Sequence, residues 1–325
     1  MAQRPARVGI GLAVRNGETT LKQTVQSILK QTYGDFRLIV SDNASTDGTE
    51  EICRSVAAHD ERVLYLRQAG NLGPAANFNA AEQAAGGELF KWAAADDLYE
   101  PTYLEACVHA LDEDPDAVLA YPRTRIIGPG NEWLRDYEYE AEVTDPRPSV
   151  RFRKYLLVEQ RRHLGAEIFG LIRHRALCSV GPMGAFARAD HVLCAGLTLM
   201  GTFRLVPEFL FLNRDHPGRS LRTTPSRAFR GRSFSVSELG SGPIPAADWW
   251  DPSKQGKIVW PEWRLFREYA AVVNRVPLSS AERRSCRATV AGVAARHGHK
   301  LARDVLINSE LELRTRRLIT PPPDE

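Results

Sequence analysis

Hydrophobic and polar positions follow two different periods in the first 120 residues of the chain. Short apolar runs of strand length, such as RVGIGLAV and FRLIV, alternate with stretches in which apolar residues recur every three or four positions. Leu21, Val25 and Ile28 show the second pattern, which places their side chains on one face of a helix. The predicted strands are residues 7–14, 36–40, 62–66, 88–93 and 117–121, and the predicted helices begin near residues 21, 47 and 74 and after Pro101.

This alternation of strand and helix predicts an α/β fold. A helix that joins two neighbouring strands makes them parallel, and successive crossovers cover both faces of the sheet. We therefore expect a single, mostly parallel sheet with helices on both faces. Asp47, with Glu50 three residues later, is typical of a capping box that opens the second helix.

The alternation of strand and helix patterns becomes weaker after about residue 122, where Pro and Gly interrupt it. Residues 217–256 show little periodicity, and a stretch of that length without regular structure is usually functional. The remaining prediction is a largely helical C-terminal extension, in which the last long helical pattern breaks near His297. The elements predicted in this half are helices over residues 152–160, 190–200, 261–273 and 279–313, and a strand over 206–212.

Charge and cysteine content narrow the functional classes. The chain has 43 Lys and Arg against 40 Asp and Glu, and a net charge of +3 is too small to indicate a nucleic-acid partner. The five cysteines form no CxxC pair, which favours buried thiols in a reducing compartment over disulfides or a zinc site. No apolar run approaches the length of a transmembrane helix, and the first 15 residues lack a signal-peptide pattern. We therefore expect a cytoplasmic protein.

Polar groups follow each of the first four predicted strands. In an open parallel sheet, ligands bind at the carboxyl ends of the strands. The sequence has no GxGxxG after the first strand, no P-loop and no GxSxG elbow, so the common dinucleotide, nucleoside-triphosphate and hydrolase sites are excluded. The polar segments are RNGE at 15–18, SDNASTDGT at 41–49, NLG at 71–73 and DD at 96–97.

Taken in order, these segments resemble a known family. The strand ending in VRNGE, the SDNASTDGT run, the NLG and the ADD followed by Pro101 are similar to the nucleotide-binding half of inverting family 2 glycosyltransferases with the GT-A fold. Further along, Ala189-Asp190, Gly201, the VPE at 206–208 and the RDHP at 214–217 resemble the acceptor-side segment of that family. The resemblance covers residues 6–220.

The resemblance implies a division of the chain and an activity. Residues 1–122 would form the nucleotide-sugar-binding α/β half, 123–220 the acceptor-binding half of the same GT-A domain, and 221–325 a loop-rich, then helical extension with a disordered tail. The implied activity is a metal-dependent inverting glycosyltransferase, with UDP as the expected donor nucleotide. The implied acceptor is a saccharide, a lipid-linked molecule or a small metabolite, and the oligomeric state is open.

The implied metal site uses hard ligands at a strand end. A nucleotide-sugar donor carries a diphosphate whose charge grows as the sugar leaves, and Mg²⁺ or Mn²⁺ held by carboxylates stabilises that charge. The resemblance makes Asp96 the first choice of ligand, Asp97 a second ligand or a ribose contact, and His216 a further ligand. The family's D-x-D would begin at position 94, where this chain has Ala94. From the residues alone, the Asp pair also fits a helix start before Pro101.

The implied donor contacts come from the other strand ends. Asp42 corresponds to the acidic residue that accepts a hydrogen bond from the nucleobase, and Val14, Arg15, Glu18 and Asn71 complete the set. An arginine that often follows Asn71 in the family is replaced by Ala76. From the residues alone, Asp42 also fits an Asx turn and Arg15 an exposed surface residue, while Asp47 is expected to be a cap.

The implied base is Asp190, which would remove the proton from the attacking acceptor hydroxyl. The family commonly has Glu-Asp here, whereas this chain has Ala189 before the aspartate. Asp190 also fits a helix N-cap, and His191 is expected on the helix surface. Arg214 and Arg219 are either phosphate ligands or surface residues. Acceptor contacts are expected from residues 169–171, residues 181–186 and the Trp249-Trp250 pair.

Three alternatives compete with this reading. A nucleotidyltransferase shares the α/β architecture, but it usually has a Gly-rich loop with Lys or Arg after the first strand, which RNG at 15–17 matches poorly. A non-catalytic sugar- or nucleotide-binding relative is suggested by Ala76, Ala94 and Ala189. Peripheral membrane contact is suggested by arginines of the C-terminal helices, although a solvated helical face is the favoured explanation for them. Those arginines are 283, 284, 287, 314, 316 and 317.

Overall fold

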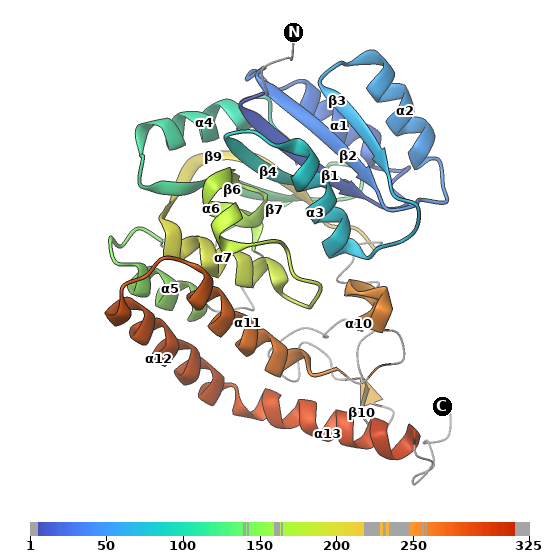
Figure 1. Ribbon diagram of the computed structural model, residues 1–325. Helices are drawn as coiled ribbons and strands as arrows, with labels where there is room; N and C mark the ends of the chain where they lie inside the picture. Colours follow the sequence, from blue (N-terminus) through green and yellow to red (C-terminus); the bar gives the residue numbers. More distant parts are fainter. Residues whose placement is uncertain are drawn as a thin grey trace.

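The computed structural model describes residues 6–138, 141, 143–158, 163, 165–217, 228–229, 232–233, 247–254, 257 and 259–315. Figure 1 shows the sheet with its covering helices in one part of the molecule and the C-terminal helices α11–α13 along the other, with α5 and α7 between them. The expected disordered tail, Arg219, Arg316 and Arg317 lie outside the described residues.

The first half alternates strand and helix as the apolar pattern predicts. Apolar positions in β1, β2, β4 and β6 are buried on both faces, as expected for their almost continuous hydrophobic runs, whereas the edge strand β3 is only partly buried. The elements are β1 (Val8–Val14), α1 (Leu21–Leu29), β2 (Phe36–Asp42), α2 (Thr49–His59), β3 (Val63–Arg67), α3 (Pro74–Ala85), β4 (Leu89–Ala94), β5 (Leu98–Tyr99), α4 (Tyr103–Glu113) and β6 (Ala117–Ile127).

The second half mixes short strands with helices. The elements are β7 (Trp133–Tyr137), α5 (Pro148–Leu156), η1 (Ala166–Phe169), β8 (Leu171–Arg173), α6 (His174–Val180), α7 (Ala189–Met200), β9 (Thr202–Arg214), β10 (Ala228–Phe229), β11 (Arg232–Ser233), α10 (Ala247–Trp250), η2 (Pro252–Lys254), α11 (Pro261–Arg275), α12 (Ser280–Arg296) and α13 (Gly298–Thr315). The predicted break at His297 is confirmed, because α12 ends there and α13 begins at the next residue.

Two boundaries differ from the prediction. The strand expected over 117–121 continues through Pro122 to Ile127, because β9 pairs with it in parallel and the register shifts after the proline. The helix expected over 152–160 instead begins at Pro148, which occupies the first helical turn, and ends at Leu156.

The main sheet runs in the order β3-β2-β1-β4-β8-β6-β9-β5, with β7 added to β6. The first four strands pair in parallel, and so do β6 and β9. The prediction of a mostly parallel sheet is approximate, because β8, β7 and β5 join antiparallel. The order reverses at β1, whose neighbours are β2 on one side and β4 on the other.

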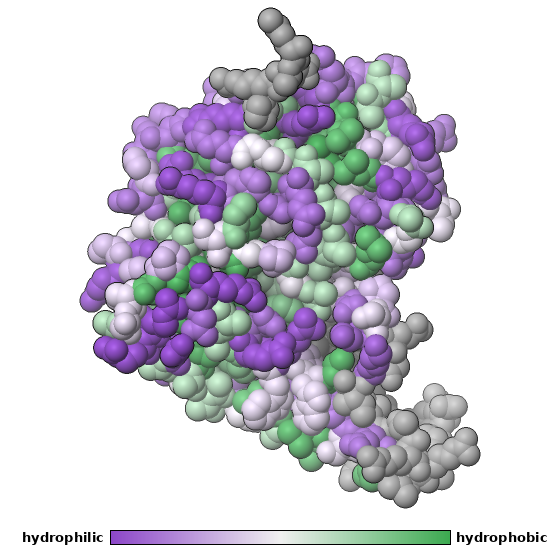
Figure 2. Space-filling model, viewed as in Figure 1, coloured by the Kyte–Doolittle hydropathy of each residue, from purple (hydrophilic) through white to green (hydrophobic). Residues whose placement is uncertain are grey.

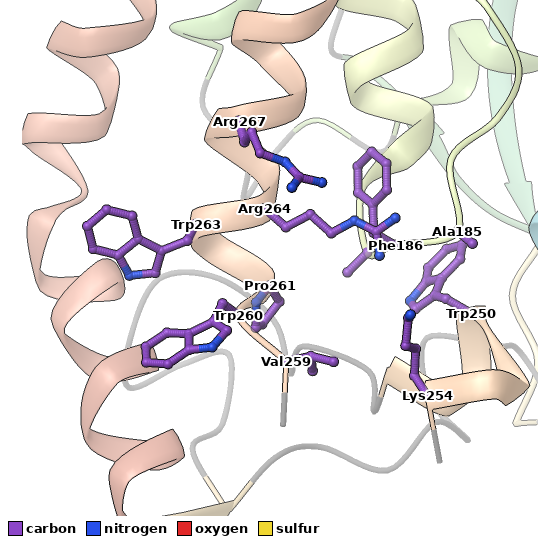
Figure 3. Close-up of a pocket in the computed structure, with 11 residues that line it drawn as sticks. Ala185, Phe186, Trp250, Lys254, Val259, Trp260, Pro261, Trp263, Arg264 and Arg267 are labelled. Atoms are coloured by element: carbon purple, nitrogen blue, oxygen red, sulfur yellow. The ribbon is translucent and has the colours of Figure 1, made fainter. Parts of the chain in front are cut away.

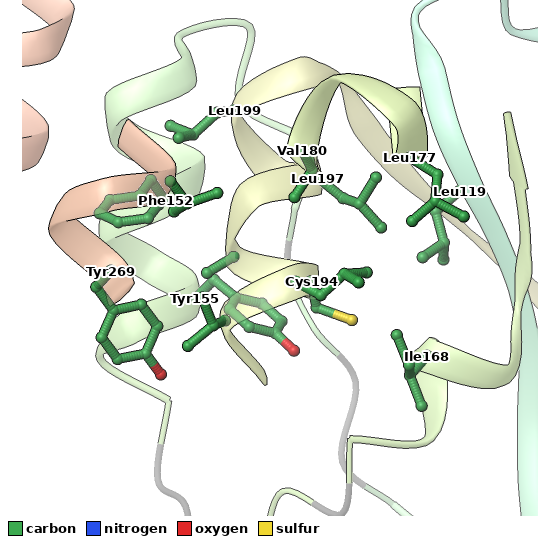
Figure 4. Packing of buried hydrophobic residues seen from close by; sticks show 14 of the residues in the cluster. Leu119, Phe152, Tyr155, Ile168, Leu177, Val180, Cys194, Leu197, Leu199 and Tyr269 are labelled. Atoms are coloured by element: carbon green, nitrogen blue, oxygen red, sulfur yellow. The ribbon is translucent and has the colours of Figure 1, made fainter. Parts of the chain in front are cut away.

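The molecule has two hydrophobic cores, and helix α7 is at the centre of the one that lies between the sheet and the C-terminal helices. Figure 4 shows Leu199 of α7 beside Phe152 of α5 and Cys194 of α7 beside Tyr155, with Leu197 on the opposite side near Leu177 and with Tyr269 of α11 beside the α5 side chains. The helices approach closely at Gly196, where a Cβ would lie 2.5 Å from Val180 Cγ1 and 2.6 Å from Val272 Cγ2. The cysteines are free and four of them are buried, as expected for Cys53, Cys107 and Cys194.

The outer surface is mostly polar on the face that Figure 2 shows, with apolar residues in small groups. In the part of the chain that the structure describes, no helix is both long and apolar enough to cross a lipid bilayer. Two of the C-terminal arginines make internal contacts. The guanidinium of Arg283 donates to the carbonyls of Val273, Val276 and Leu278, and Arg287 donates to Asn274.

Candidate active site

A cavity of about 400 Å³ opens at the carboxyl ends of β1, β2 and β4, where the strand order reverses. Ligands of open α/β sheets bind at this position. Five of the residues that the resemblance implies as donor or metal contacts line it: Val14, Arg15, Asn71, Asp96 and His216. Asn43 and Trp249 also line the cavity. Asp42, Glu18, Asp97 and Asp190 do not.

Asp96 and His216 meet inside this cavity although 120 residues separate them in the chain. The pairing of β5 with β9 carries the end of β9 past the loop that follows β4. As a result, His216 Nε2 lies 3.0 Å from Asp96 Oδ2. Both side chains are partly exposed to the cavity, at 21% for His216 and 30% for Asp96. A carboxylate oxygen and an imidazole nitrogen at this separation form a pair of ligands that fits a divalent cation.

Asp97 points away from the cavity and into the protein. Its side chain is 1% exposed and accepts hydrogen bonds from the Arg214 backbone N–H at 2.8 Å and from Asn213 Nδ2 at 3.1 Å. The structure therefore does not place this carboxylate beside Asp96 as a second ligand. It fastens the end of β9 to the loop that carries Asp96.

Arg214 is neither a surface residue nor a cavity residue. It is 1% exposed, and its Nε donates to the Asp96 carbonyl at 2.7 Å. The rest of the guanidinium donates to Pro129 O, to Asn131 Oδ1 and to Gln23 Oε1. Its N–H groups therefore join three segments of the chain, and its guanidinium is not exposed to bind a phosphate directly.

Asp42 is fully buried, and both of its carboxylate oxygens accept hydrogen bonds. Oδ1 accepts from the backbone N–H and the hydroxyl of Ser45, and Oδ2 accepts from Tyr65 at 2.8 Å and from Arg67 at 2.7 Å. The next residue, Asn43, faces the cavity instead and donates to Asn71 Oδ1 at 2.9 Å. In the sequence, Asn43 belongs to the SDNASTDGT run that follows the second predicted strand.

Glu18 and Asp47 hold two loops together at the start of α2. Glu18 Oε2 accepts from the Gly48 N–H at 2.7 Å, and Asp47 Oδ2 accepts from the Glu18 N–H at 3.1 Å. The predicted capping box is wrong, because the N-cap of α2 is Gly48, and Asp47 Oδ1 instead accepts from the backbone N–H and the hydroxyl of Thr49. Partial burial would raise the pKa of Asp47, and these hydrogen bonds outweigh it and lower the pKa.

Asp190 lies in the first turn of α7 and does not line this cavity. The helix N-cap is Arg188, in a left-handed conformation, so Asp190 is not the N-cap itself. Asp190 Oδ1 accepts from the His191 backbone N–H at 2.8 Å. Burial raises the pKa of the Asp190 carboxyl, and the nearby Glu167 charge raises it further. A raised pKa makes the carboxylate a stronger base.

A group of buried titratable side chains packs against Asp190. Glu167 accepts from Tyr155 at 2.6 Å and pairs with His163 at 2.7 Å. His191 is not on the helix surface as expected, because its ring packs on Tyr155 and its Nδ1 lies 2.6 Å from the Tyr269 hydroxyl. Burial lowers the pKa of His191 to about 3, so this ring is neutral at pH 7.

The residues expected to contact an acceptor are divided among three places. Trp249 lines the first cavity, while Phe186 and Trp250 line a second, larger cavity beside it. Leu171 is fully buried in β8, and Phe169 packs on Phe211.

One further group of possible metal ligands lies outside both cavities. Glu82, His174 and Cys178 have ligand atoms within 4.8 Å of one another. His174 Nε2 pairs with Glu82 at 2.6 Å, and its Nδ1 lies 3.1 Å from the Gly87 carbonyl. Any cation-binding measurement on this protein must separate this group from Asp96 and His216.

Comparison with known proteins identifies a family that matches about half of the chain. Residues 10–183 match the model of glycosyl transferase family 2. The uncharacterized glycosyltransferase MJ1057 of Methanocaldococcus jannaschii is 26% identical over 158 residues, which are 48% of this chain and 54% of MJ1057. Glycosyltransferase GlyG of Streptococcus pneumoniae is 31% identical over 113 residues, 34% of this chain and 38% of GlyG. The chain thus spans about half or less of the length of these relatives.

Solved structures show the same fold. The crystal structure of S. aureus TarS 1-349 covers 89% of this chain and 71% of its own, with a TM-score of 0.56 and 13% identity. The same protein solved with UDP gives a TM-score of 0.52 at 15% identity, over 95% of this chain and 91% of that one. The expected GT-A-like fold is confirmed at this level.

Proposed function

The chain belongs to glycosyl transferase family 2, and on that premise we propose that it transfers a sugar from a UDP-linked donor to an acceptor hydroxyl with inversion, in a metal-dependent reaction. The observation that carries the proposal is the pair formed by Asp96 and His216, 3.0 Å apart in the cavity at the reversal of strand order. A TarS structure of the same fold contains UDP, which supports the choice of nucleotide.

In this proposal the donor nucleotide lies across the ends of β1 and β2. Arg15 is exposed at the cavity and supplies a positive charge for the base or the diphosphate. Asn43 and Asn71, which hydrogen-bond each other, supply amide groups at the opposite wall. The buried Asp42 acts through the turn that carries Asn43, because its own oxygens already accept hydrogen bonds.

Asp96 Oδ2 and His216 Nε2 would hold Mg²⁺ or Mn²⁺ next to the diphosphate. When bound, the cation neutralises the charge that develops on the leaving nucleoside diphosphate. Asp97 and Arg214, which hydrogen-bond the loop after β4 to the end of β9, would hold the two ligands in position.

Asp190 would act as the base in a single displacement. The acceptor oxygen forms a bond to the anomeric carbon, the bond from that carbon to the diphosphate oxygen breaks, and its electron pair leaves with the nucleotide. The acceptor proton passes to the Asp190 carboxylate, whose basicity is increased by burial.

Calorimetric titration tests the donor site first. UDP, dTDP and GDP are titrated into the wild type and into Asp96→Ala, with and without Mn²⁺. We expect UDP to bind in a Mn²⁺-dependent manner, and we expect Asp96→Ala to weaken that binding about tenfold or more because a direct ligand is lost.

Cys178→Ser is the matched control, since it removes a ligand from the other candidate cation group. It should leave nucleotide binding unchanged. If none of the three nucleotides binds to the wild type, the proposed function is wrong. If UDP binds regardless of Mn²⁺ and of Asp96, the metal site is wrong while the donor remains.

A further inference from the structure

A second cavity, of about 550 Å³, lies between α11, the loop before α7 and the segment that carries α10 and η2. Figure 3 shows the side chains of Arg264 and Arg267 extending from α11 toward Phe186, with Trp250 and Lys254 on the far side. The described residues that line it include three cations and no carboxylate. Four of them are aromatic: Phe186, Trp250, Trp260 and Trp263.

The charge around this cavity is positive after its ion pairs are counted. Glu268 is a single carboxylate shared by Arg264 at 3.9 Å, Arg267 at 3.1 Å and Arg275 at 3.6 Å. Lys254 lies 3.9 Å from Asp251. The three cations that line the cavity therefore have two carboxylate partners, and one of these, Glu268, is also shared with Arg275 at the other end of α11. Arginine guanidinium groups match phosphate oxygens in charge and geometry.

The aromatic side chains offer surfaces suited to a sugar ring. The Arg264 guanidinium stacks 4.9 Å above the Phe186 ring, so it is held in place by a cation–π contact. Trp260 and Trp263 are 43% and 50% exposed, which is unusual for tryptophan and leaves indole surface open to a ligand. Trp250 Nε1 is buried without a hydrogen-bond partner among the described residues. Such an N–H is a donor that a bound ligand or a water molecule can satisfy.

The position of the cavity links it to both parts of the proposed reaction. Trp250 lines it, and the neighbouring Trp249 lines the donor-side cavity. Their segment is fixed against the start of α3, since a Cβ on Gly73 would lie 2.7 Å from the Trp250 carbonyl. On the other side, Ala187 lines the cavity three residues before Asp190. The second cavity thus adjoins the donor cavity and the segment leading to the base.

We propose that this second cavity binds the acceptor, and that the acceptor is a saccharide carrying a phosphate group. The indole and phenyl faces contact the sugar, and Arg264, Arg267 and Lys254 bind the phosphate. This inference rests on the proposed function. The phosphate belongs either to a soluble sugar phosphate or to a sugar linked through diphosphate to a lipid, and the two sources share the chemistry that the cavity recognises.

Binding is tested by titrating a hexose 1-phosphate, the same free hexose and inorganic phosphate into the protein saturated with UDP and Mn²⁺, with tryptophan fluorescence as the signal. We expect the hexose phosphate to bind at least about tenfold more tightly than the neutral hexose. The double variant Arg264→Gln/Arg267→Gln should lose about tenfold or more of that affinity, because charge-assisted hydrogen bonds are removed. Its UDP binding should stay unchanged.

Three controls make the result decisive. Arg287→Gln changes an arginine outside the cavity and should have no effect. Arg267→Gln alone, at a side chain that is 74% exposed, keeps the fold intact and should give a smaller loss in the same direction. A short-chain polyprenyl diphosphate sugar is compared with the hexose phosphate: tighter binding assigns the phosphate to a lipid-linked acceptor, and equal binding assigns it to a soluble one.

The outcomes that overturn the inference differ from those that overturn the function. If UDP binds but the hexose phosphate does not, or binds no better than the free hexose, the phosphate acceptor is wrong and the glycosyltransferase proposal stands. Binding that is unaffected by the double variant also overturns the inference. If UDP itself does not bind, the proposed function has failed at the donor site.

Discussion

Two carboxylates behind the strand ends and the carboxylate at the start of α7 have different surroundings. Asp42 and Asp97, in the sheet half, are buried and each accept hydrogen bonds from several donors. Asp190, in the helical half, is partly exposed and accepts one backbone hydrogen bond within the described residues, and its pKa is raised by burial and by Glu167. A buried acid with several donors stabilises the fold. An acid with few donors and a raised pKa retains the ability to take up a proton, which is the property a base needs.

Replacing the proposed base should have the largest effect. Asp190→Asn keeps the size of the side chain and removes its basicity, so we expect kcat to fall by about 10²–10⁴-fold. UDP binding should be unchanged, because Asp190 does not line the donor-side cavity. Steady-state kinetics with calorimetry checks both statements. A variant that keeps more than a tenth of the wild-type kcat would remove Asp190 from the mechanism.

The adjacent acids Asp96 and Asp97 offer the next comparison. Asp97→Ala removes the acceptor for the Arg214 backbone N–H and for Asn213 in a buried site, and should lower the free energy of unfolding by about 2–4 kcal/mol. Asp96→Ala, at a partly exposed side chain, should change it by less than about 0.5 kcal/mol. Denaturant unfolding measures both. Equal losses would mean that the two carboxylates have the same structural role.

Gly196 tests the close packing of the helical half. Gly196→Ala places a methyl group 2.5 Å from Val180 and 2.6 Å from Val272, so α7 must shift away from α6 and α11. We expect a loss of about 1–3 kcal/mol in the free energy of unfolding. Gly292→Ala is the matched control, because nothing lies within 4 Å of the new Cβ on α12. A neutral Gly196→Ala would show that the core is looser than its distances indicate.

The smallest expected effect is on the pH dependence of catalysis. The base must be deprotonated, so kcat should fall as the pH is lowered through the raised pKa of Asp190, above the ordinary aspartate value of 3.8. Glu167→Gln removes a negative charge that raises this pKa, and should move the acid limb to lower pH. A pH–rate profile of both proteins gives the comparison. A shift to higher pH would contradict the coupling.

The sequence predicts those elements whose own residues carry a complete pattern. Helix α3 occupies Pro74–Ala85 as expected, because proline starts it and Gly86 follows its end. Strand β8 was missed, since its three residues are placed only by pairing with β4 and β6. The predicted strand over residues 117–121 stops before Pro122, because the sequence does not show that β9 pairs with the residues that follow the proline.

The direction of a side chain was harder to predict than its position in the chain. Asp96 and Asp97 follow the same strand, yet one faces the cavity and the other the interior. The partners that separate them, Asn213 and Arg214, come from the end of β9, more than 100 residues later. Only the folded chain brings those donors to Asp97. The same is true of Asp42, whose partners Tyr65 and Arg67 lie on β3.

Strand β9 is synthesised more than 100 residues after the four parallel strands, so the cavity is completed late in synthesis. The four parallel strands and Asp96 are complete by residue 96, but His216 and the Arg214 guanidinium arrive only when residues 202–216 have left the ribosome and docked. Until then the cavity lacks His216, and Asp97 lacks the donors that Asn213 and Arg214 supply. Under the proposed function, a nascent or truncated chain would lack one of the two cation ligands, and cation-dependent nucleotide affinity would report whether the chain has finished folding.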